Sequence, residues 1–214
     1  HCHSREGSAW DDTYVGFYDR LAPDRVLHRG LKSIDEVVAK LQQVERTLTD
    51  AQAPLMAWGL DPLFFDSRRM VTADLDKVSS TRPVLILHQS GHILNVNRAT
   101  LQRANISHDT DVMGLMKDAQ GEPTGELQGP PLRYLVHRAL GYDRSIAAGS
   151  PRGLWRFAHS AQLAGVTTAT DLANELPEQS VASQIEVTQD DTYPLRIVPA
   201  FVGISRPAPE GVSW

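Results

Sequence analysis

Residues 150–171, SPRGLWRFAHSAQLAGVTTATD, decide the fold class because they predict one helix followed directly by one strand. Ser150 and Pro151 are residue types favoured at the N-cap and in the first turn of a helix. Gly165 is typical of the position just beyond a helix C-terminus. The β-branched run that follows predicts a strand ending at Asp171. A helix that leads directly into a strand is a building unit of α/β folds.

The same alternation of strands and helices extends over the rest of the chain. The run PVLILH at 83–88 predicts a strand that is buried on both faces, as in a parallel sheet. Ser33 and Glu36 have the spacing of a capping box, and the apolar residues that follow recur at helical intervals. The expected strands are 54–58, 83–88, 166–170 and 195–201. Helices are expected to begin after Ser33, Asn97 and Ser150 and after a cap at Thr72, and a further helix is expected at about 176–189. We therefore expect an α/β fold with a mainly parallel sheet.

The segment between about 90 and 150 has a different character. Glycine and proline are concentrated at 105–130, which predicts a loop or a small antiparallel excursion. We interpret 1–214 as a fragment of one domain, a partial (β/α) TIM-type barrel truncated at both ends, with an inserted lobe at about 90–150. A complete barrel takes about 250 residues, so at least one sheet edge should be open.

The composition limits the classes of function. The 214 residues carry a net charge of −5, which gives no electrostatic reason to expect nucleic-acid binding. No apolar run reaches the ~20 residues that span a bilayer. Cys2 is the only cysteine, so the chain has no internal disulfide, which is compatible with the cytoplasm. We expect a small-molecule substrate and neither a nucleic acid nor a membrane as a partner.

The first residues, His1-Cys2-His3, are the strongest candidates for metal ligands. Side chains of an extended strand alternate, so His1 and His3 would lie on the same side and could hold one ion together. The alternative is a terminal triplet with no role in the protein that scavenges copper or nickel. A strand that carries ligands needs residues before it, and we therefore expect the chain to be a piece of a larger enzyme.

Further candidates lie at the carboxyl ends of predicted strands, where the catalytic groups of α/β barrels converge. Asp171 would act in the site or cap the following helix. His92, after Ser90, would face the substrate or donate to a backbone carbonyl in a tight turn. Trp58 would take part in recognition or in packing. We expect His1, His3, His92 and Asp171 to share one mouth of the sheet.

Two other polar residues are expected to have ordinary structural roles. His88 ends a buried strand and is expected to be a core histidine with a satisfied hydrogen bond. Glu126 follows a turn-forming sequence and is expected to be an exposed carboxylate. Neither residue is included among the candidate site residues.

Taken in order, several motifs resemble those of amidohydrolase family 3, the YtcJ-like branch of the metal-dependent amidohydrolases. They are His1 with His3, Ala57-Trp58-Gly59-Leu60-Asp61, Leu75-Asp76-Lys77-Val78-Ser79, Arg82-Pro83-Val84, Ser90-Gly91-His92, Val96-Asn97, Gly121-Glu122-Pro123-Thr124-Gly125-Glu126-Leu127 and Gly165-Val166-Thr167-Thr168-Ala169-Thr170-Asp171. The resemblance spans essentially the whole chain. The ordered set is more specific than any one of its motifs.

The resemblance implies a hydrolase that cleaves C–N bonds with water activated by a divalent metal, expected to be zinc, with one or two ions. It assigns His1 and His3 to the metal. Other features of the family, a carboxylated lysine, two later histidines and a general-base aspartate, would follow Trp214, so we expect this chain alone to be inactive. Where the family often has a glutamate, this chain has Gln128.

Two other functions compete with this interpretation. A copper enzyme could use a processed His1, but it would need a secreted β-sandwich, usually with disulfides. A non-catalytic fragment could retain the fold without the chemistry. The α/β alternation and the single cysteine favour the hydrolase over the copper enzyme.

Overall fold

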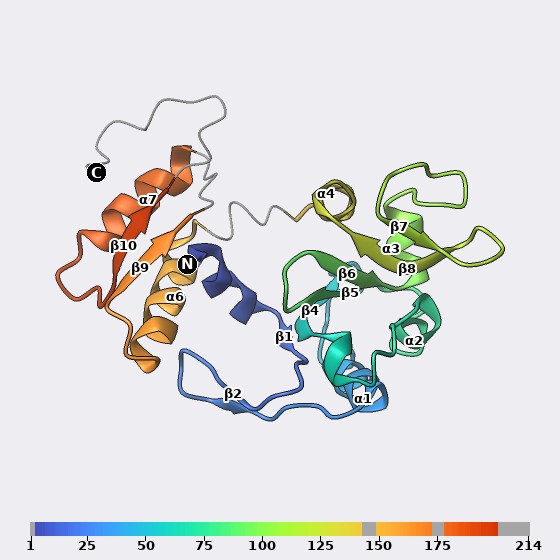
Figure 1. Ribbon diagram of the computed structural model, residues 1–214, viewed down its shortest axis with the longest axis horizontal. Coiled ribbons are helices and arrows are strands. Elements are labelled where there is room, and N and C mark those ends of the chain that lie inside the picture. The colour runs from blue at the N-terminus through green and yellow to red at the C-terminus, as the bar shows by residue number, and fades with distance from the viewer. Residues whose placement is uncertain (1–2, 143–148, 173–177, 201–214) are drawn as a thin grey trace. The chain divides into compact units, whose positions relative to one another are not determined.

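The computed structural model describes residues 3–142, 149–172 and 178–200, which form two compact units (Figure 1). The terminal unit comprises the described parts of 1–10, 22–26 and 144–214. The central unit comprises 11–21 and 27–142. Each unit has its own strands, helices and buried side chains. None of the helices in the described part of the chain has the length and apolar content needed to cross a bilayer.

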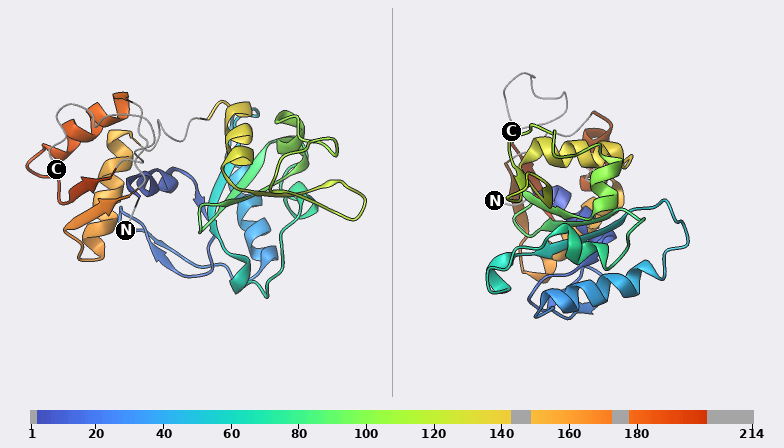
Figure 2. Two further views of the ribbon diagram at one scale, coloured as in Figure 1. Left: turned by 45° about the horizontal axis from the view of Figure 1, so that its top comes forward. Right: turned by 90° about the vertical axis from the view of Figure 1, so that its right-hand side faces the viewer.

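The central unit is built on a six-stranded mixed sheet (Figure 2). Its strands, in spatial order, are β1 (Thr13–Tyr14), β4 (Leu55–Leu60), β5 (Val84–His88), β6 (Ile93–Val96), β8 (Pro123–Gln128) and β7 (Leu115–Lys117). Strands β1, β4 and β5 pair in parallel, whereas β5, β6, β8 and β7 pair antiparallel. A separate antiparallel hairpin joins β2 (Arg20–Leu21) to β3 (Leu27–His28).

The helices of the central unit cover both faces of this sheet. They are α1 (Ile34–Glu45), α2 (Thr72–Asp76), α3 (Arg98–Arg103) and α4 (Pro130–Ala139), with a 3₁₀ turn η2 (Pro62–Phe64) after β4. Figures 1 and 2 show α1 on one face and α4 on the other. Strand β5 therefore buries all five of its residues, which confirms the expected two-sided burial.

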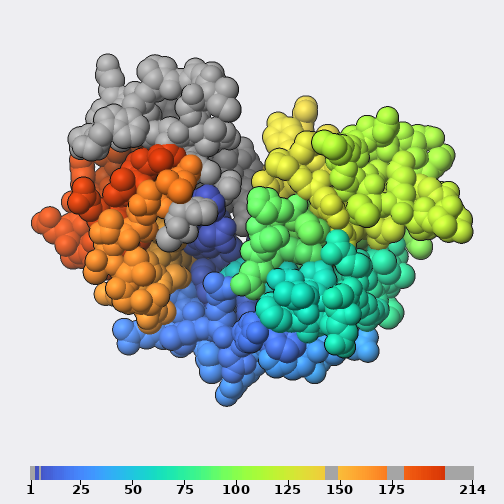
Figure 3. Space-filling model, viewed as in Figure 1, coloured from blue at the N-terminus to red at the C-terminus, as the bar shows by residue number. Residues whose placement is uncertain are grey.

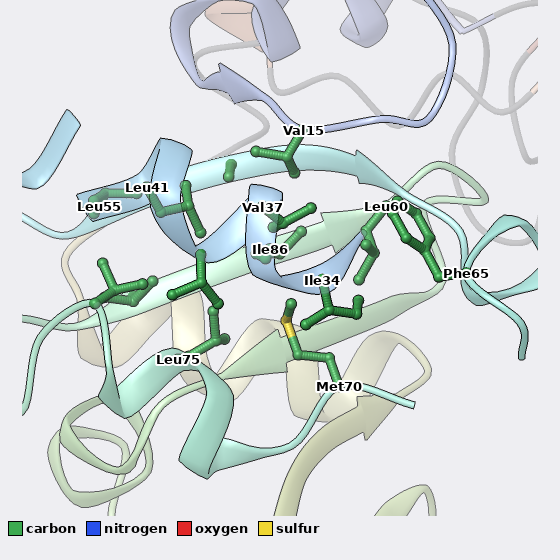
Figure 4. Close-up of a cluster of buried hydrophobic side chains, with 14 residues drawn as sticks. Val15, Ile34, Val37, Leu41, Leu55, Leu60, Phe65, Met70, Leu75 and Ile86 are labelled. Atoms are coloured by element: carbon green, nitrogen blue, oxygen red, sulfur yellow. The ribbon is translucent and has the colours of Figure 1, made fainter. Parts of the chain in front are cut away.

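Alternation along β5 divides these side chains between two packing regions. Ile86 (Figure 4) and Val84 join the cluster under α1. Because side chains alternate along a strand, the buried Leu85 and Leu87 face the other way. Helix α1 contributes Ile34, Val37, Val38 and Leu41 to that cluster at helical spacing. Each such side chain gains about 2 kcal/mol from leaving water. This burial, more than intrinsic propensity, holds α1 in place.

The helix N-termini bear out most of the sequence signals. Ser33 Oγ accepts from Glu36 N at 3.1 Å, as the capping box predicts, but the Glu36 carboxylate accepts from Lys32 N at 2.7 Å. Asn97 and Ser150 also cap their helices through their side chains.

The expected cap at Thr72 is wrong. Thr72 is the first residue of α2, and Val71 holds the N-cap position. The Asp74 carboxylate accepts from Val71 N at 3.1 Å. A carboxylate at the third helical position can reach back to that amide, so the helix starts without a capping side chain at the N-cap.

The terminal unit contains a short parallel pair of strands with helices beside it (Figure 1). Its elements are the 3₁₀ helix η1 (Ser4–Asp11), α6 (Pro151–Leu163), β9 (Thr168–Asp171), α7 (Glu178–Thr188) and β10 (Arg196–Pro199). Phe157, Ala158, Ala169 and Leu195 form its buried cluster. Gly7 allows η1 to approach α6 closely, because a Cβ there would lie 1.9 Å from the carbonyl oxygen of Gly153.

The α/β class is therefore confirmed, but the arrangement of the sheets differs from the expected one. All four predicted strands form, near 55–60, 84–88, 168–171 and 196–199, and residue 201 lies outside the described residues. The first two strands belong to the mixed sheet and the last two to a separate pair. The described residues thus do not form a single mainly parallel sheet.

The antiparallel half of the mixed sheet has a simple cause. Only residues 89–92 connect β5 to β6. A parallel crossover needs a dozen or more residues, so a connection this short makes β6 turn back along β5. Strands β7 and β8 lie within residues 105–130 and pair antiparallel, which agrees with the antiparallel excursion expected there, whereas β6 was not predicted.

Candidate metal centre

His3 and Asp171 meet within the terminal unit, although they are far apart in sequence. His3 directly precedes η1, and Asp171 is the last residue of β9. The His3 Nδ1 atom lies 3.2 Å from Asp171 Oδ1. The Asp171 side chain is 5% exposed and the His3 side chain 27% exposed. A buried carboxylate thus holds one ring nitrogen of a histidine that remains partly open to solvent.

Ser4 fixes the other oxygen of the same carboxylate. Asp171 Oδ2 accepts from Ser4 N at 2.8 Å and from Ser4 Oγ at 2.6 Å. The first amides of a helix lack intrahelical acceptors and favour a negative charge. Asp171 therefore caps η1, a helix 167 residues earlier in the chain, while its second oxygen contacts His3.

The local structure of β9 explains why the carboxylate points inward. Ala169 and Asp171 are buried, whereas Thr168 and Thr170 are exposed, which is the alternation of a strand with one covered face. Strand β9 pairs in parallel with β10 over four positions, and Ala200 N donates to Asp171 O at 2.7 Å. Side-chain alternation and backbone pairing together thus fix the position and the inward direction of the Asp171 carboxylate.

These residues suit a metal site in their chemistry. Metal-binding histidines commonly donate one ring N–H to a carboxylate, which directs the lone pair of the other nitrogen toward the ion. The Nδ1 contact between His3 and Asp171 has this form. His1, the other expected ligand, lies outside the described residues. Within residues 3–142, 149–172 and 178–200, no group of three or more acidic, histidine or cysteine side chains gathers closely enough to hold a metal.

The remaining candidates belong to the central unit. The His92 ring is exposed, and its backbone lies in a tight turn, where His92 N donates to Ser90 Oγ at 3.3 Å. Trp58 is 6% exposed and packs edge-on against Tyr14, with the ring centroids 5.1 Å apart. The Arg20 guanidinium lies 5.0 Å from the centroid of the Trp58 ring. Among the described site residues that we predicted, His3 contacts Asp171 in the terminal unit, and His92 contacts Ser90 in the central unit.

The two residues that we expected to be structural have different outcomes. His88 is buried, and its Nε2 lies 2.5 Å from Asn95 Oδ1, as expected of a satisfied core histidine. The prediction for Glu126 is wrong, because this residue is only 3% exposed. Its carboxylate accepts from Arg69 Nε at 2.8 Å, from Arg69 Nη2, and from Gln128 Nε2 at 2.7 Å. Arg69 is 57 residues away, and no local pattern in the sequence signals that pairing.

Comparison with known proteins identifies the family. A family model described as the amidohydrolase family matches residues 26–211. YtcJ of Bacillus subtilis (strain 168), a protein that carries an amidohydrolase name, is 37% identical over 101 residues. That alignment covers 45% of this chain and 19% of YtcJ, so the chain matches only a minor part of its relative's length.

Two solved structures share the fold. One is described as an uncharacterized metal-dependent hydrolase from Pyrococcus horikoshii and has a TM-score of 0.54 at 13% identity, with 93% of this chain and 35% of that chain covered. The second, described in the same words and from Pyrococcus furiosus, has a TM-score of 0.52 at 13% identity and coverages of 94% and 36%. With the family match over residues 26–211, the conclusion is that this chain belongs to the amidohydrolase family, in the YtcJ-like branch that its motifs indicated.

Proposed function

We propose that this chain is part of a metal-dependent hydrolase that cleaves amide-type C–N bonds in small molecules. In this proposal the terminal unit supplies His1 and His3 to a divalent ion, and Asp171 is a positioning residue. The observation that carries it is the contact between His3 Nδ1 and the buried Asp171 carboxylate. Family membership and the fold shared with metal-dependent hydrolases support the choice of chemistry.

Each residue has a distinct task in this arrangement. Asp171 Oδ1 accepts the Nδ1–H of His3, which leaves the Nε2 lone pair as the metal ligand. The two bonds from Ser4 keep the Asp171 carboxylate from rotating. On an extended strand, the alternation of side chains would place His1 on the same side as His3. A divalent ion, when bound, lowers the pKa of a water molecule and polarises the carbonyl of the substrate.

Zinc is the ion that this set favours. Imidazole nitrogens are common zinc ligands, and catalytic zinc sites leave a coordination position for water. The carboxylate of Asp171 is already occupied by three hydrogen bonds, so we assign it to orienting His3 and not to the ion. The α/β architecture is not the β-sandwich that the copper alternative requires.

Zinc binding to the full 214-residue chain tests the proposal. A competition titration with a chromophoric chelator would compare the wild type with His3→Ala, with Asp171→Asn and with a matched control, His108→Ala. The His108 side chain is 61% exposed and lies in the central unit. We expect His3→Ala to weaken zinc binding by at least about tenfold and Asp171→Asn by about 10- to 100-fold.

The control separates a specific site from adventitious binding. His108→Ala should bind zinc as the wild type does. Unchanged affinity in His3→Ala, or an equal loss in His108→Ala, would contradict the proposed ligand. Circular dichroism of each variant identifies a loss of fold, and Ser4→Ala provides a milder change at the same carboxylate if Asp171→Asn unfolds the unit.

A further inference from the structure

A pocket of about 350 Å³ lies in the central unit at the carboxyl ends of two neighbouring parallel strands. Asp61 follows β4 and Ser90 follows β5, and both residues line the pocket. Figure 3 shows the segments 61–69 and 88–93, in teal and green, next to each other at the surface of this unit. This edge of an α/β sheet is where ligands commonly bind, and the volume suits a small molecule.

His88 supplies a buried hydrogen-bond acceptor to the pocket. The residue lines the pocket and is only 4% exposed. Asn95 Nδ2 donates to Met70 O at 2.9 Å, so Asn95 Oδ1 must accept from His88 Nε2. The ring therefore carries its proton on Nε2, and its Nδ1 atom, to which no described residue donates, keeps a lone pair. Burial lowers the pKa of His88, which keeps the ring neutral near pH 7.

Two oxygen atoms add further acceptors to the same wall. Asp61 Oδ1 accepts from Leu63 N at 3.0 Å, and no described residue donates to Asp61 Oδ2. Ser90 Oγ accepts from His92 N at 3.3 Å and has a second lone pair. With His88 Nδ1, the pocket thus offers three kinds of acceptor. A protonated primary amine carries three N–H donors and no acceptor, so its hydrogen-bonding capacity matches this wall.

The charges at the pocket favour a cation over an anion. Glu126 is 3% exposed and binds Arg69 through Nε and Nη2, which compensates the charge of the guanidinium. Asp61 adds a second carboxylate, and no side chain in the described part of the chain forms an ion pair with it. Two negative charges therefore stand against one positive charge beside the His88 ring. A carboxylate or phosphate would be repelled, whereas a cation would be attracted.

The size and the apolar part of the pocket favour an organic cation over a bare metal ion. A water molecule takes up about 30 Å³ in the liquid, far less than the volume available here. Pro62, Leu63 and Ile93 line the pocket and would contact a short aliphatic substituent. Within the ranges that the structure describes, no three acidic, histidine or cysteine side chains gather to hold a metal.

We propose that this pocket binds a primary ammonium ion with a short aliphatic substituent, whose N–H groups donate to Asp61, His88 and Ser90. This inference goes beyond the proposed hydrolase function, because it concerns other residues, in the central unit, and needs no metal. The test is a ¹⁵N-HSQC titration of the full 214-residue chain in EDTA. Because EDTA removes divalent ions, failure here leaves the zinc experiment unaffected, and failure there leaves this one unaffected.

The probe is isoamylammonium, compared with three molecules that share its branched aliphatic group. Isoamyl alcohol is uncharged, isovalerate is an anion, and the N-trimethyl derivative of isoamylammonium keeps the positive charge without any N–H donor. We expect isoamylammonium to cause saturable shifts at the amides of Asp61, Leu63 and Ser90. The alcohol and the carboxylate should bind at least about tenfold more weakly, because they lack the charge. The trimethyl derivative should bind about tenfold more weakly, because it cannot donate hydrogen bonds.

Two variants and a matched control test the assigned acceptors. Asp61→Asn should weaken binding of isoamylammonium by about tenfold, as the loss of a charged acceptor predicts, and asparagine still caps the turn that follows. Ser90→Ala removes an uncharged acceptor and should weaken binding by about threefold. The control, Asp109→Asn, changes an 82% exposed side chain of the same unit and should have no effect.

Three results would overturn the inference. One is the absence of saturation with isoamylammonium. The second is binding of the alcohol, the carboxylate or the trimethyl derivative as tightly as the primary ammonium ion. The third is wild-type affinity in an Asp61→Asn variant that circular dichroism shows to be folded. If Asp61→Asn does not fold, the comparison of the four probes on the wild type decides the question alone.

Discussion

The central and terminal units both place polar side chains at the carboxyl ends of parallel strands, but they hold them in different ways. In the central unit, Asp61 and Ser90 follow strands that are supported by a cluster of fourteen buried residues. In the terminal unit, Asp171 ends a two-stranded pair, and among the described residues the cluster beside it has four buried members. There, hydrogen bonds from Ser4 and His3 also hold the carboxylate that ends β9. The end of a strand can thus be held by polar contacts as well as by packing.

The largest expected effect tests the apolar support of the central unit. Leu41→Ala removes a fully buried side chain of α1, and we expect the free energy of unfolding to fall by about 3 kcal/mol. Urea denaturation followed by circular dichroism measures it. Leu21→Ala, at a 45% exposed position in the same unit, should change the stability by less than about 0.5 kcal/mol. Similar losses in both variants would refute the assigned role of this core.

The next effect tests the polar support of the terminal unit. Asp171→Asn weakens three accepted hydrogen bonds at a buried position, and we expect a loss of about 2 kcal/mol. Amide hydrogen exchange should become faster at Ser4, whose N–H donates to this carboxylate, and stay unchanged along β5. Asp191→Asn, at an exposed position, is the control. Unchanged protection of the Ser4 amide would show that the packing of η1 suffices without the cap.

A smaller effect concerns the ion pair behind the pocket. Glu126→Gln keeps the shape of the side chain but removes the charge that binds Arg69, and we expect a loss of about 1 kcal/mol. The Arg69 side chain is 51% exposed, so part of the interaction is screened by solvent. Thermal unfolding measures the change, and Glu122→Gln at an exposed site nearby serves as the comparison. Equal melting temperatures in the wild type and Glu126→Gln would contradict this role.

The smallest effect is a dependence on pH in the central unit. Burial lowers the pKa of His88 below its ordinary value of 6.5, while nearby Glu126 and Asp61 oppose the shift and Arg69 adds to it. Below pH 6.5 the unfolded chain binds a proton that the folded chain does not, so stability falls as the pH drops. The stability that the neutral His88 ring contributes is fully retained above pH 6.5. Denaturation between pH 5 and 8 should show this slope, and His88→Asn should flatten it. An identical slope in both proteins would assign the titration to another group.

The sequence predicted the local structure well where the signal was short in range. The Ser33 cap, the Ser150-Pro151 start and the Gly165 end were each found, because a cap depends on three or four neighbouring residues. Thr72 was wrongly predicted as the N-cap of α2, because the helix could start at either of two adjacent residues. The Asp74 side chain accepts from Val71 N and so favours Val71 as the N-cap. The candidate site was predicted only as a set of residues. The structure then joined His3 to Asp171 through their side chains in the terminal unit.

By itself, the sequence determined the alternation of helices and strands, the two-sided burial of 83–88 and the family to which the chain belongs. Only the tertiary structure decided which strands share a sheet, that Asp171 caps a helix 167 residues away, and that Glu126 is buried against Arg69. The physical reason is the range of the forces. Periodicity and capping act within a few residues, whereas a buried carboxylate takes its partner from whichever segment the packed core brings beside it.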